Sequence, residues 1–267
     1  MRALGNFAGL LRNENMKIYR RARTYIMGAI LVGLVLMISI MWAAFGGRDV
    51  SMWDVVFLES SILFFLITIF TVVVAAGAVA EEFTSGTIKL LLIRPWSRSK
   101  ILLAKYIAVV AFALCLALLL FTSTIVVNWL IFDLFNSVQA EPTFPMKEGV
   151  STVGYMLQYY GLTLITTVMT VTLAFMLSTV FRSSGLAIGF ALFLLLVVNN
   201  VVMLLAALQY KWVDYILFVH LNLTQYLNDI PIREGMSLGF SLAVLAGYYA
   251  LFMALTWYVF NKRDVAA

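Results

Sequence analysis

The chain has 267 residues, of which 63% are apolar and only 12% are charged. An ordinary soluble domain is roughly 45–50% apolar and about 25% charged. Because a soluble chain of this length could not cover so much apolar surface, the composition excludes a cytosolic enzyme, a disordered chain and a secreted disulfide scaffold. It favours a protein that crosses a membrane several times.

Cysteine and histidine are nearly absent. The single Cys115 cannot form an internal disulfide, and the single His220 leaves no histidine-rich metal site. We therefore expect no metal in this chain. The net charge is +5, and the basic residues gather at the ends of apolar runs. We therefore expect contact with membrane lipid and none with nucleic acid.

Six apolar runs are long enough to form membrane-spanning helices. A helix needs about 20 residues to cross a bilayer core of roughly 30 Å. The third run is longer than that, so we expect its first turns to project into the cytoplasm. The runs predict an all-α membrane protein with a single transmembrane domain over 1–267, and they cover 25–45, 55–80, part of 101–134, 153–181, 186–208 and 237–260.

The charged residues between these runs predict the orientation. Most lysines and arginines precede the first run, join the second to the third, or follow the fourth and sixth. Most acidic residues, including Asp54 and Glu59, are assigned to the other side. The positive-inside rule then places both termini in the cytoplasm of a multi-pass protein of the bacterial cell membrane. An even number of spans requires the same arrangement.

Residues 1–24 predict an additional helix on the cytoplasmic side. Leu4, Phe7, Leu11 and Ile18 recur at helical spacing among basic residues, which is typical of an interfacial helix. It could be an anchor attracted to anionic lipid or an elbow that also touches a cytoplasmic partner.

The segment 209–236 predicts a helical element on the outer face. Apolar residues from Trp212 to Ile230 follow steps of four and three, and Pro231 ends the pattern. Polar residues interrupt it, so we expect a re-entrant or surface-lying helix and not a further span. His220 lies here and is interpreted as a hydrogen-bonded interfacial residue, with a ligand or pH-switch role as the alternative.

The segment 81–100, between the second and third runs, carries the most information. Glu81 and Glu82 lie at the end of one helix, and Gly86 separates it from the next. Thr87 can cap a short amphipathic helix, which ends at Pro95. Such a helix could dock on a cytosolic partner. Alternatively, it is a connector resting on lipid.

This segment also carries a family resemblance. The run E-E-x-x-x-G-T-x-K-L-L-L-x-x-P-x-S-R-x-x-I-L-x-x-K resembles the signature of bacterial type-2 ABC exporter permeases. It is most similar to small permease subunits of Gram-positive two-component exporters of the kind found in peptide-antibiotic resistance. The basic N-terminal helix, the span count and the outer helical loop are similar too, so the resemblance covers nearly the whole chain.

The resemblance implies a division of labour. Two permease subunits, identical or different, form the path. Each carries a short coupling helix, on which one of two separate ATPase subunits docks. The positions that match the coupling motif are Glu81, Glu82, Gly86, Thr87, Leu90, Leu91, Pro95 and Arg98. The chain has no G-x-x-x-x-G-K-[ST] motif to hold a triphosphate. ATP and Mg²⁺ would therefore bind the partner, and this chain would not be an enzyme.

Polar residues within the spans are candidates for lining a path. Because the span centres carry essentially no ionisable group, the sequence disfavours a proton- or sodium-driven carrier and favours apolar or amphipathic cargo. The alternative for these polar residues is hydrogen bonding between packed helices. They are Asn199, Asn200, Thr163, Thr167, Thr170 and Asn128.

Two pairs of small residues allow close approach of helices. They are Ala29 with Gly33 and Gly185 with Gly189. Since spans one and five face the second permease in the family, both pairs are dimer-interface candidates.

The leading hypothesis is the membrane subunit of an ABC exporter. The alternatives are a membrane sensor or immunity protein, and a secondary transporter without an ATPase partner. A lipid-modifying membrane enzyme would need clustered catalytic side chains at membrane depth, which the sequence does not offer.

Overall fold

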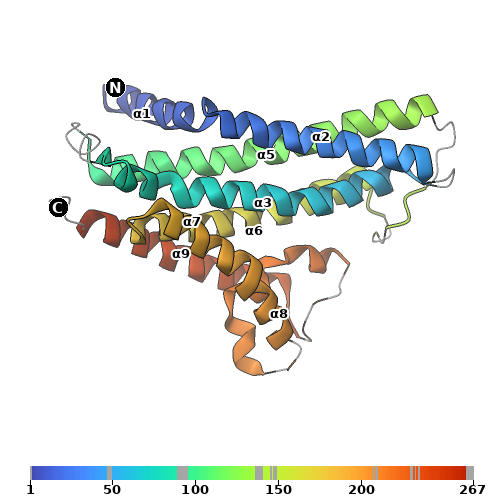
Figure 1. The fold of residues 1–267 in the computed structure, drawn as a ribbon. Helices are drawn as coiled ribbons and strands as arrows, with labels where there is room; N and C mark the ends of the chain where they lie inside the picture. The colour runs from blue at the N-terminus through green and yellow to red at the C-terminus, as the bar shows by residue number, and fades with distance from the viewer. Residues whose placement is uncertain are drawn as a thin grey trace.

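The computed structural model describes residues 2–46, 50–88, 96–135, 141–144, 146, 149–206, 208, 210–228, 231, 233 and 235–262. Throughout these ranges every regular element is helical, and six helical stretches are long and apolar enough to cross a membrane (Figure 1). This confirms the predicted all-α membrane protein. The stretches are α2 (Ala22–Phe45), α3 (Met52–Thr84), α5 (Arg98–Phe135), α6 (Thr152–Val180), Ser184–Ala206 and α9 (Leu238–Lys262).

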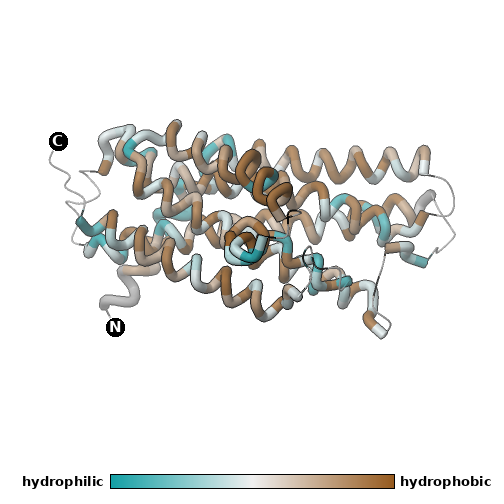
Figure 2. The backbone as a smooth tube through the Cα atoms, turned by 90° about the horizontal axis from the view of Figure 1, so that it is seen from below, coloured by the Kyte–Doolittle hydropathy of each residue, from teal (hydrophilic) through white to brown (hydrophobic). Residues whose placement is uncertain are grey.

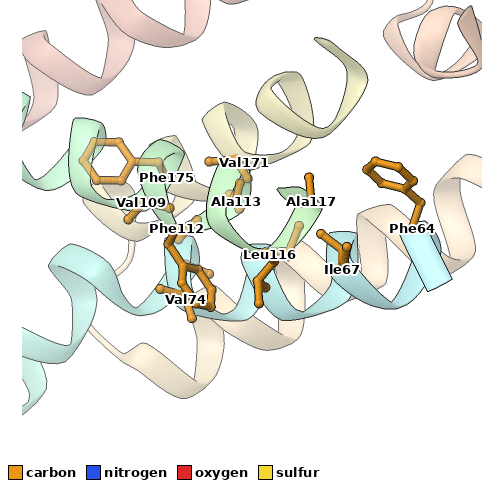
Figure 3. Packing of buried hydrophobic residues seen from close by; sticks show 14 of the residues in the cluster. Phe64, Ile67, Val74, Val109, Phe112, Ala113, Leu116, Ala117, Val171 and Phe175 are labelled. Atoms are coloured by element: carbon orange, nitrogen blue, oxygen red, sulfur yellow. The ribbon is translucent and has the colours of Figure 1, made fainter. Parts of the chain in front are cut away.

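The core lies between α3, α5 and α6. Val74 of α3 lies beside Phe112 of α5, and Phe175 of α6 belongs to the same buried cluster (Figure 3). The other spanning helices keep apolar side chains on the outside, and most of the bundle is hydrophobic along its length (Figure 2). In a membrane such faces meet lipid tails or another protein without the cost that water would impose.

The helix α1 (Arg2–Tyr19) extends the bundle on the side of α5. It lies nearly in line with α2 (Figure 1). Its Leu10 packs with Ile101 and Ala104 at the start of α5, and Ile18 joins the main core. Protein therefore covers Leu10 and Ile18 of α1, whereas the predicted place of this helix at the membrane surface stays a prediction.

The two ends of the chain lie at the same end of the bundle. The start of α1 and the end of α9 are both on the left of Figure 1. The start of α5 is there too, since Arg98 Nη1 donates to the carbonyl oxygen of Asn261 at 3.0 Å. This arrangement is the one that an even number of spans requires.

The fifth spanning stretch is interrupted. It begins with α7 (Ser184–Phe193), passes through one π-helical turn, η1 (Leu194–Val198), and continues as α8 (Asn199–Ala206). Such turns change the direction in which the following side chains point, and they are frequent at functional sites.

The described part of segment 209–236, which is predicted to lie on the outer face, contains helical turns, but it is not the single helix that the spacing predicted. It forms three short 3-10 helices, η2 (Lys211–Tyr215), η3 (Leu217–Leu221) and η4 (Leu223–Leu227). His220 is fully buried, and both its ring nitrogens are hydrogen-bonded, to Ser241 Oγ and to the carbonyl oxygen of Asp214, each at 2.8 Å. Asn222 is non-helical, with φ −115° and ψ 78°. These anchors set the path of the chain in place of one continuous helical face.

Candidate functional site

Charged side chains of α1, α3 and α5 meet at the end of the bundle where the termini lie. Glu82, in the last turn of α3, lies 2.8 Å from Lys17 Nζ and 3.0 Å from Lys105 Nζ. Lys105 also lies 2.9 Å from Glu14, and its side chain is only 4% exposed. Removing one partner from such a buried group leaves an uncompensated charge. The Glu82 cluster, which consists of Glu14, Lys17, Glu82 and Lys105, therefore holds these helices together.

A second ion group sits beside this cluster. Glu81 Oε1 accepts from Arg23 Nη1 at 2.7 Å, and Arg21 pairs with its other oxygen. Arg21 and Arg23 flank the start of α2, so the group ties the junction between α1 and α2 to the end of α3. The two groups line an open pocket of about 490 Å³.

Lys17 stays charged within the cluster. Burial lowers the pKa of Lys17, but the carboxylates of Glu82 and Glu14 more than compensate and hold it above its ordinary value. The stability that these contacts provide is therefore fully present below the usual lysine pKa and is lost only as the pH rises through the higher folded value. Lys17 therefore keeps its charge across the physiological pH range.

The Glu82 cluster continues into the segment that follows α3. Thr87 Oγ1 donates to Glu82 Oε2 at 2.6 Å. Gly86 has a φ of +70°, a conformation that glycine adopts without steric cost. The chain therefore turns at Gly86 and is fastened again at Thr87.

The predicted coupling residues are described only in part. Glu81, Glu82, Gly86, Thr87 and Arg98 have the contacts given above. Leu90, Leu91 and Pro95 lie outside the described residues. The short amphipathic helix thus stays a prediction.

Two charged residues are buried within spanning helices of the bundle. Lys105 is in the third turn of α5, and Glu59 is buried in α3, about two turns from its start. Glu59 accepts from Ser39 Oγ at 2.6 Å and from Asn128 Nδ2 at 2.7 Å. Glu59 lies near the start of α3 and not at its centre, so the expectation that the span centres carry essentially no ionisable group stays a prediction. Hydrogen bonds from two neighbouring helices make this carboxyl tolerable in the interior.

Four of the path-lining candidates come together. They line a pocket of about 340 Å³ between α3, α6, the start of α8 and the outer 3-10 helices: Thr163, Thr167, Thr170 and Asn199. Ser61 and Thr68 of α3 line it too, which the sequence did not predict. Two hydroxyl residues seven positions apart in an apolar run are a weak signal, because either could serve packing alone.

The other two path-lining candidates lie elsewhere. Asn200 is exposed and donates to the carbonyl oxygen of Leu196 at 2.5 Å. Asn128 is buried in α5, where it donates to Glu59 and to the carbonyl oxygen of Thr124. Neither residue lines the pocket at Asn199.

All four small residues of the proposed dimer interface face outward. Ala29 and Gly33 on α2 are exposed, as are Gly185 and Gly189 on α7. The positions of Gly33 and Gly189 have open space beside them. Both pairs are accessible to a neighbouring subunit because they are exposed. The helices that carry them, α2 and α7, lie on either side of α3 (Figure 1). Contact with a second permease stays a prediction.

A metal site has no support within the described ranges. No group of three or more His, Cys, Asp or Glu residues there could hold a metal ion.

Comparison with known proteins shows where the chain belongs. It is 41% identical to "Uncharacterized protein YhcI" of Bacillus subtilis (strain 168) over 202 residues, 74% of this chain and 64% of that protein. The match thus spans less than two thirds of YhcI. The chain is 30% identical to "Uncharacterized membrane protein YdbK" of the same organism over 207 residues, 75% of this chain and 78% of YdbK. Residues 23–266 match the family described as "Protein of unknown function (DUF2705)". The chain is therefore a multi-pass membrane protein that belongs to the DUF2705 family.

Proposed function

We propose that this chain is the membrane subunit of an ATP-driven ABC exporter in a bacterial cell membrane. A separate ATPase binds ATP and Mg²⁺ and docks on the segment between α3 and α5. Both termini lie in the cytoplasm, and two permease subunits form the path. The single observation that carries this proposal is Glu82, which joins α1, α5 and Thr87 at one carboxylate.

The geometry supports mechanical coupling through that carboxylate. A partner that moves the segment after Gly86 pulls on Thr87, which is bonded to Glu82 at the end of α3. Glu82 passes the movement to Lys105 on α5 and Lys17 on α1. Because separating buried charges is costly, these helices tilt as one unit. Rigid-body tilting of packed helices is a common way to switch access to a path.

The remaining features of the proposal concern cargo and assembly. The pocket at Asn199 has polar and apolar walls, which supports apolar or amphipathic cargo such as an antibiotic, peptide or lipid-like molecule. The exposed small residues of α2 and α7 support contact of these two helices with a second permease subunit.

One observation favours a secondary transporter instead. A buried carboxyl within a membrane-spanning helix, such as Glu59, is a common site of ion coupling. The two functions differ in what Glu59→Gln does. In an exporter, ATP-driven transport persists, whereas in an ion-coupled carrier this change abolishes transport.

Cysteine crosslinking in native membranes tests the exporter proposal. In a Cys115→Ala background, Thr87→Cys lies beside the expected docking segment. Ser151→Cys, directly before the start of α6, serves as the control. We expect a thiol–amine crosslinker to join Thr87→Cys, but not Ser151→Cys, to a protein with a G-x-x-x-x-G-K-[ST] motif, identified by mass spectrometry. Absence of an ATPase adduct at Thr87→Cys would contradict the proposal. A membrane-impermeant thiol reagent on the same variants reports which side each end faces.

A further inference from the structure

We propose that the pocket at Asn199 binds the polar head of an amphiphile that donates hydrogen bonds, with alkyl amines as the simplest class. This inference deepens the proposed function by naming a cargo class. Only the transport of this ligand rests on the proposed function, since binding itself requires no ATPase.

The threonine hydroxyls of α6 that line the pocket have already used their protons. On α6, Thr163 donates to the carbonyl oxygen of Tyr159 and Thr167 to that of Thr163, each at 2.8 Å. Thr170 donates to the carbonyl oxygen of Thr167 at 2.8 Å. A hydroxyl has one proton and two lone pairs, so each of these groups can offer the pocket only an acceptor.

The facing helix repeats this arrangement. Ser61 on α3 donates to the carbonyl oxygen of Leu58 at 2.8 Å, and Thr68 donates to that of Phe64 at 2.9 Å. The pocket is therefore lined on two sides by hydroxyl oxygens whose protons point into their own helices. A ligand that needs a donor from the wall would have to break one of these bonds.

Asn199 adds an acceptor that has no donor. Its Oδ1 is shielded from solvent and makes no hydrogen bond within the described part of the chain. It directly follows the π-helical turn η1, which alters the direction of side chains after it. A buried acceptor without a partner raises the free energy of the folded state, and a donor on a ligand would remove that cost.

The rest of the wall suits the apolar part of an amphiphile. The described lining contains no Asp, Glu, Lys or Arg, and it includes the rings of Phe64, Phe65 and Tyr159. An anionic head would meet hydroxyl lone pairs on both α3 and α6, and only the amides of Asn199 and Asn222 and the phenol of Tyr159 carry further N–H or O–H donors among the side chains of that described lining. An ammonium would instead gain charge-assisted hydrogen bonds, with aromatic faces nearby.

Three ligands with the same alkyl chain separate these possibilities. The purified chain, in phosphatidylcholine nanodiscs without an ATPase, is heated in the presence of dodecylamine, dodecyltrimethylammonium or dodecanoate. We expect dodecylamine to raise the unfolding midpoint in a saturable way. Dodecyltrimethylammonium, which has the same charge but no donor, should bind about tenfold more weakly, and dodecanoate should not bind. Equal responses to the two cations, or a stronger response to dodecanoate, would overturn the inference.

Matched variants locate the site. Thr167→Val and Asn199→Leu remove an acceptor each and should weaken dodecylamine binding about fivefold or more, whereas Thr167→Ser keeps the oxygen and should bind like the parent protein. Thr122→Val is the control, because Thr122 makes the same bond to its own helix at 2.8 Å but is exposed on α5 away from the pocket. If both acceptor variants bind as the parent does, the pocket is not the site. This result is independent of the crosslinking at Thr87, so binding and ATPase coupling can fail separately.

Discussion

Replacing Lys105 by methionine tests the Glu82 cluster. The lysine Nζ lies 2.9 Å from Glu14, 3.0 Å from Glu82 and 3.1 Å from the carbonyl oxygen of Ala78. Methionine has a similar length but no charge, so Lys105→Met leaves two buried carboxylates with only Lys17 between them. Removing one partner of a buried ion pair costs about 3–5 kcal/mol. We expect a loss of that size in the free energy of unfolding.

Two further variants set the scale for this loss. Lys17 is 36% exposed, so Lys17→Met should cost only about 1 kcal/mol. Arg12 is exposed on the same helix, and Arg12→Met should cost less than about 0.5 kcal/mol. Combining Lys105→Met with Glu14→Gln removes one stranded carboxylate and should recover part of the loss.

Unfolding in mixed micelles, followed by tryptophan fluorescence, measures these differences. The reasoning predicts the order Lys105→Met, then Lys17→Met, then Arg12→Met, from the largest loss to the smallest. If Lys105→Met were no more harmful than Arg12→Met, the cluster would not hold the helices together and the coupling argument would fail.

Three other predictions concern the turn after α3, the buried carboxyl and the outer segment. Gly86→Ala forces a side chain into a positive φ and should cost about 1 kcal/mol in unfolding experiments. Glu59→Leu removes the acceptor that Asn128 and Ser39 share and should cost about 1–3 kcal/mol, while Glu59→Gln keeps an acceptor and should cost less. Burial lowers the pKa of His220, so the unfolded chain binds a proton that the folded chain does not. Stability should therefore fall as the pH drops below about 6.5, and His220→Gln should flatten that pH dependence.

Each of these predictions has a contradicting result. A Gly86→Ala protein as stable as the parent would show that the turn does not need its left-handed backbone. Equal losses for Glu59→Gln and Glu59→Leu would remove hydrogen bonding as the reason that this carboxyl is tolerated. An unchanged pH profile in His220→Gln would assign the acid sensitivity to other groups.

The apolar pattern was sufficient to predict the spanning helices, because membrane crossing depends on length and hydropathy within one run. The excess length of 101–134 correctly indicated a helix longer than a span, now seen as α5. The stripe of threonines on α6 was predicted as well, since helical spacing alone puts them on one face.

What the sequence did not predict depends on contacts between distant residues. Lys105 and Glu14 are 91 positions apart, so the helix that carries Lys105 could be predicted, whereas its buried partner could not. Glu59 lies within the second apolar run, but its hydrogen bonds with Ser39 and Asn128 could not be predicted from that run alone. The outer segment fits the spacing of an α-helix, but the hydrogen bonds of His220 to Ser241 and Asp214 hold it as short turns.

Purification of the chain from its native membrane in mild detergent tests the central claim most directly. Intact-mass measurement of the purified assembly gives the partner and its ratio. The exporter account predicts an ATPase subunit in one-to-one ratio with this chain. It also predicts loss of that subunit when residues 86–95 are replaced by a Gly-Ser segment of equal length, and its retention when 141–150 is replaced in the same way. A chain that purifies without an ATPase under every nucleotide condition would contradict the account.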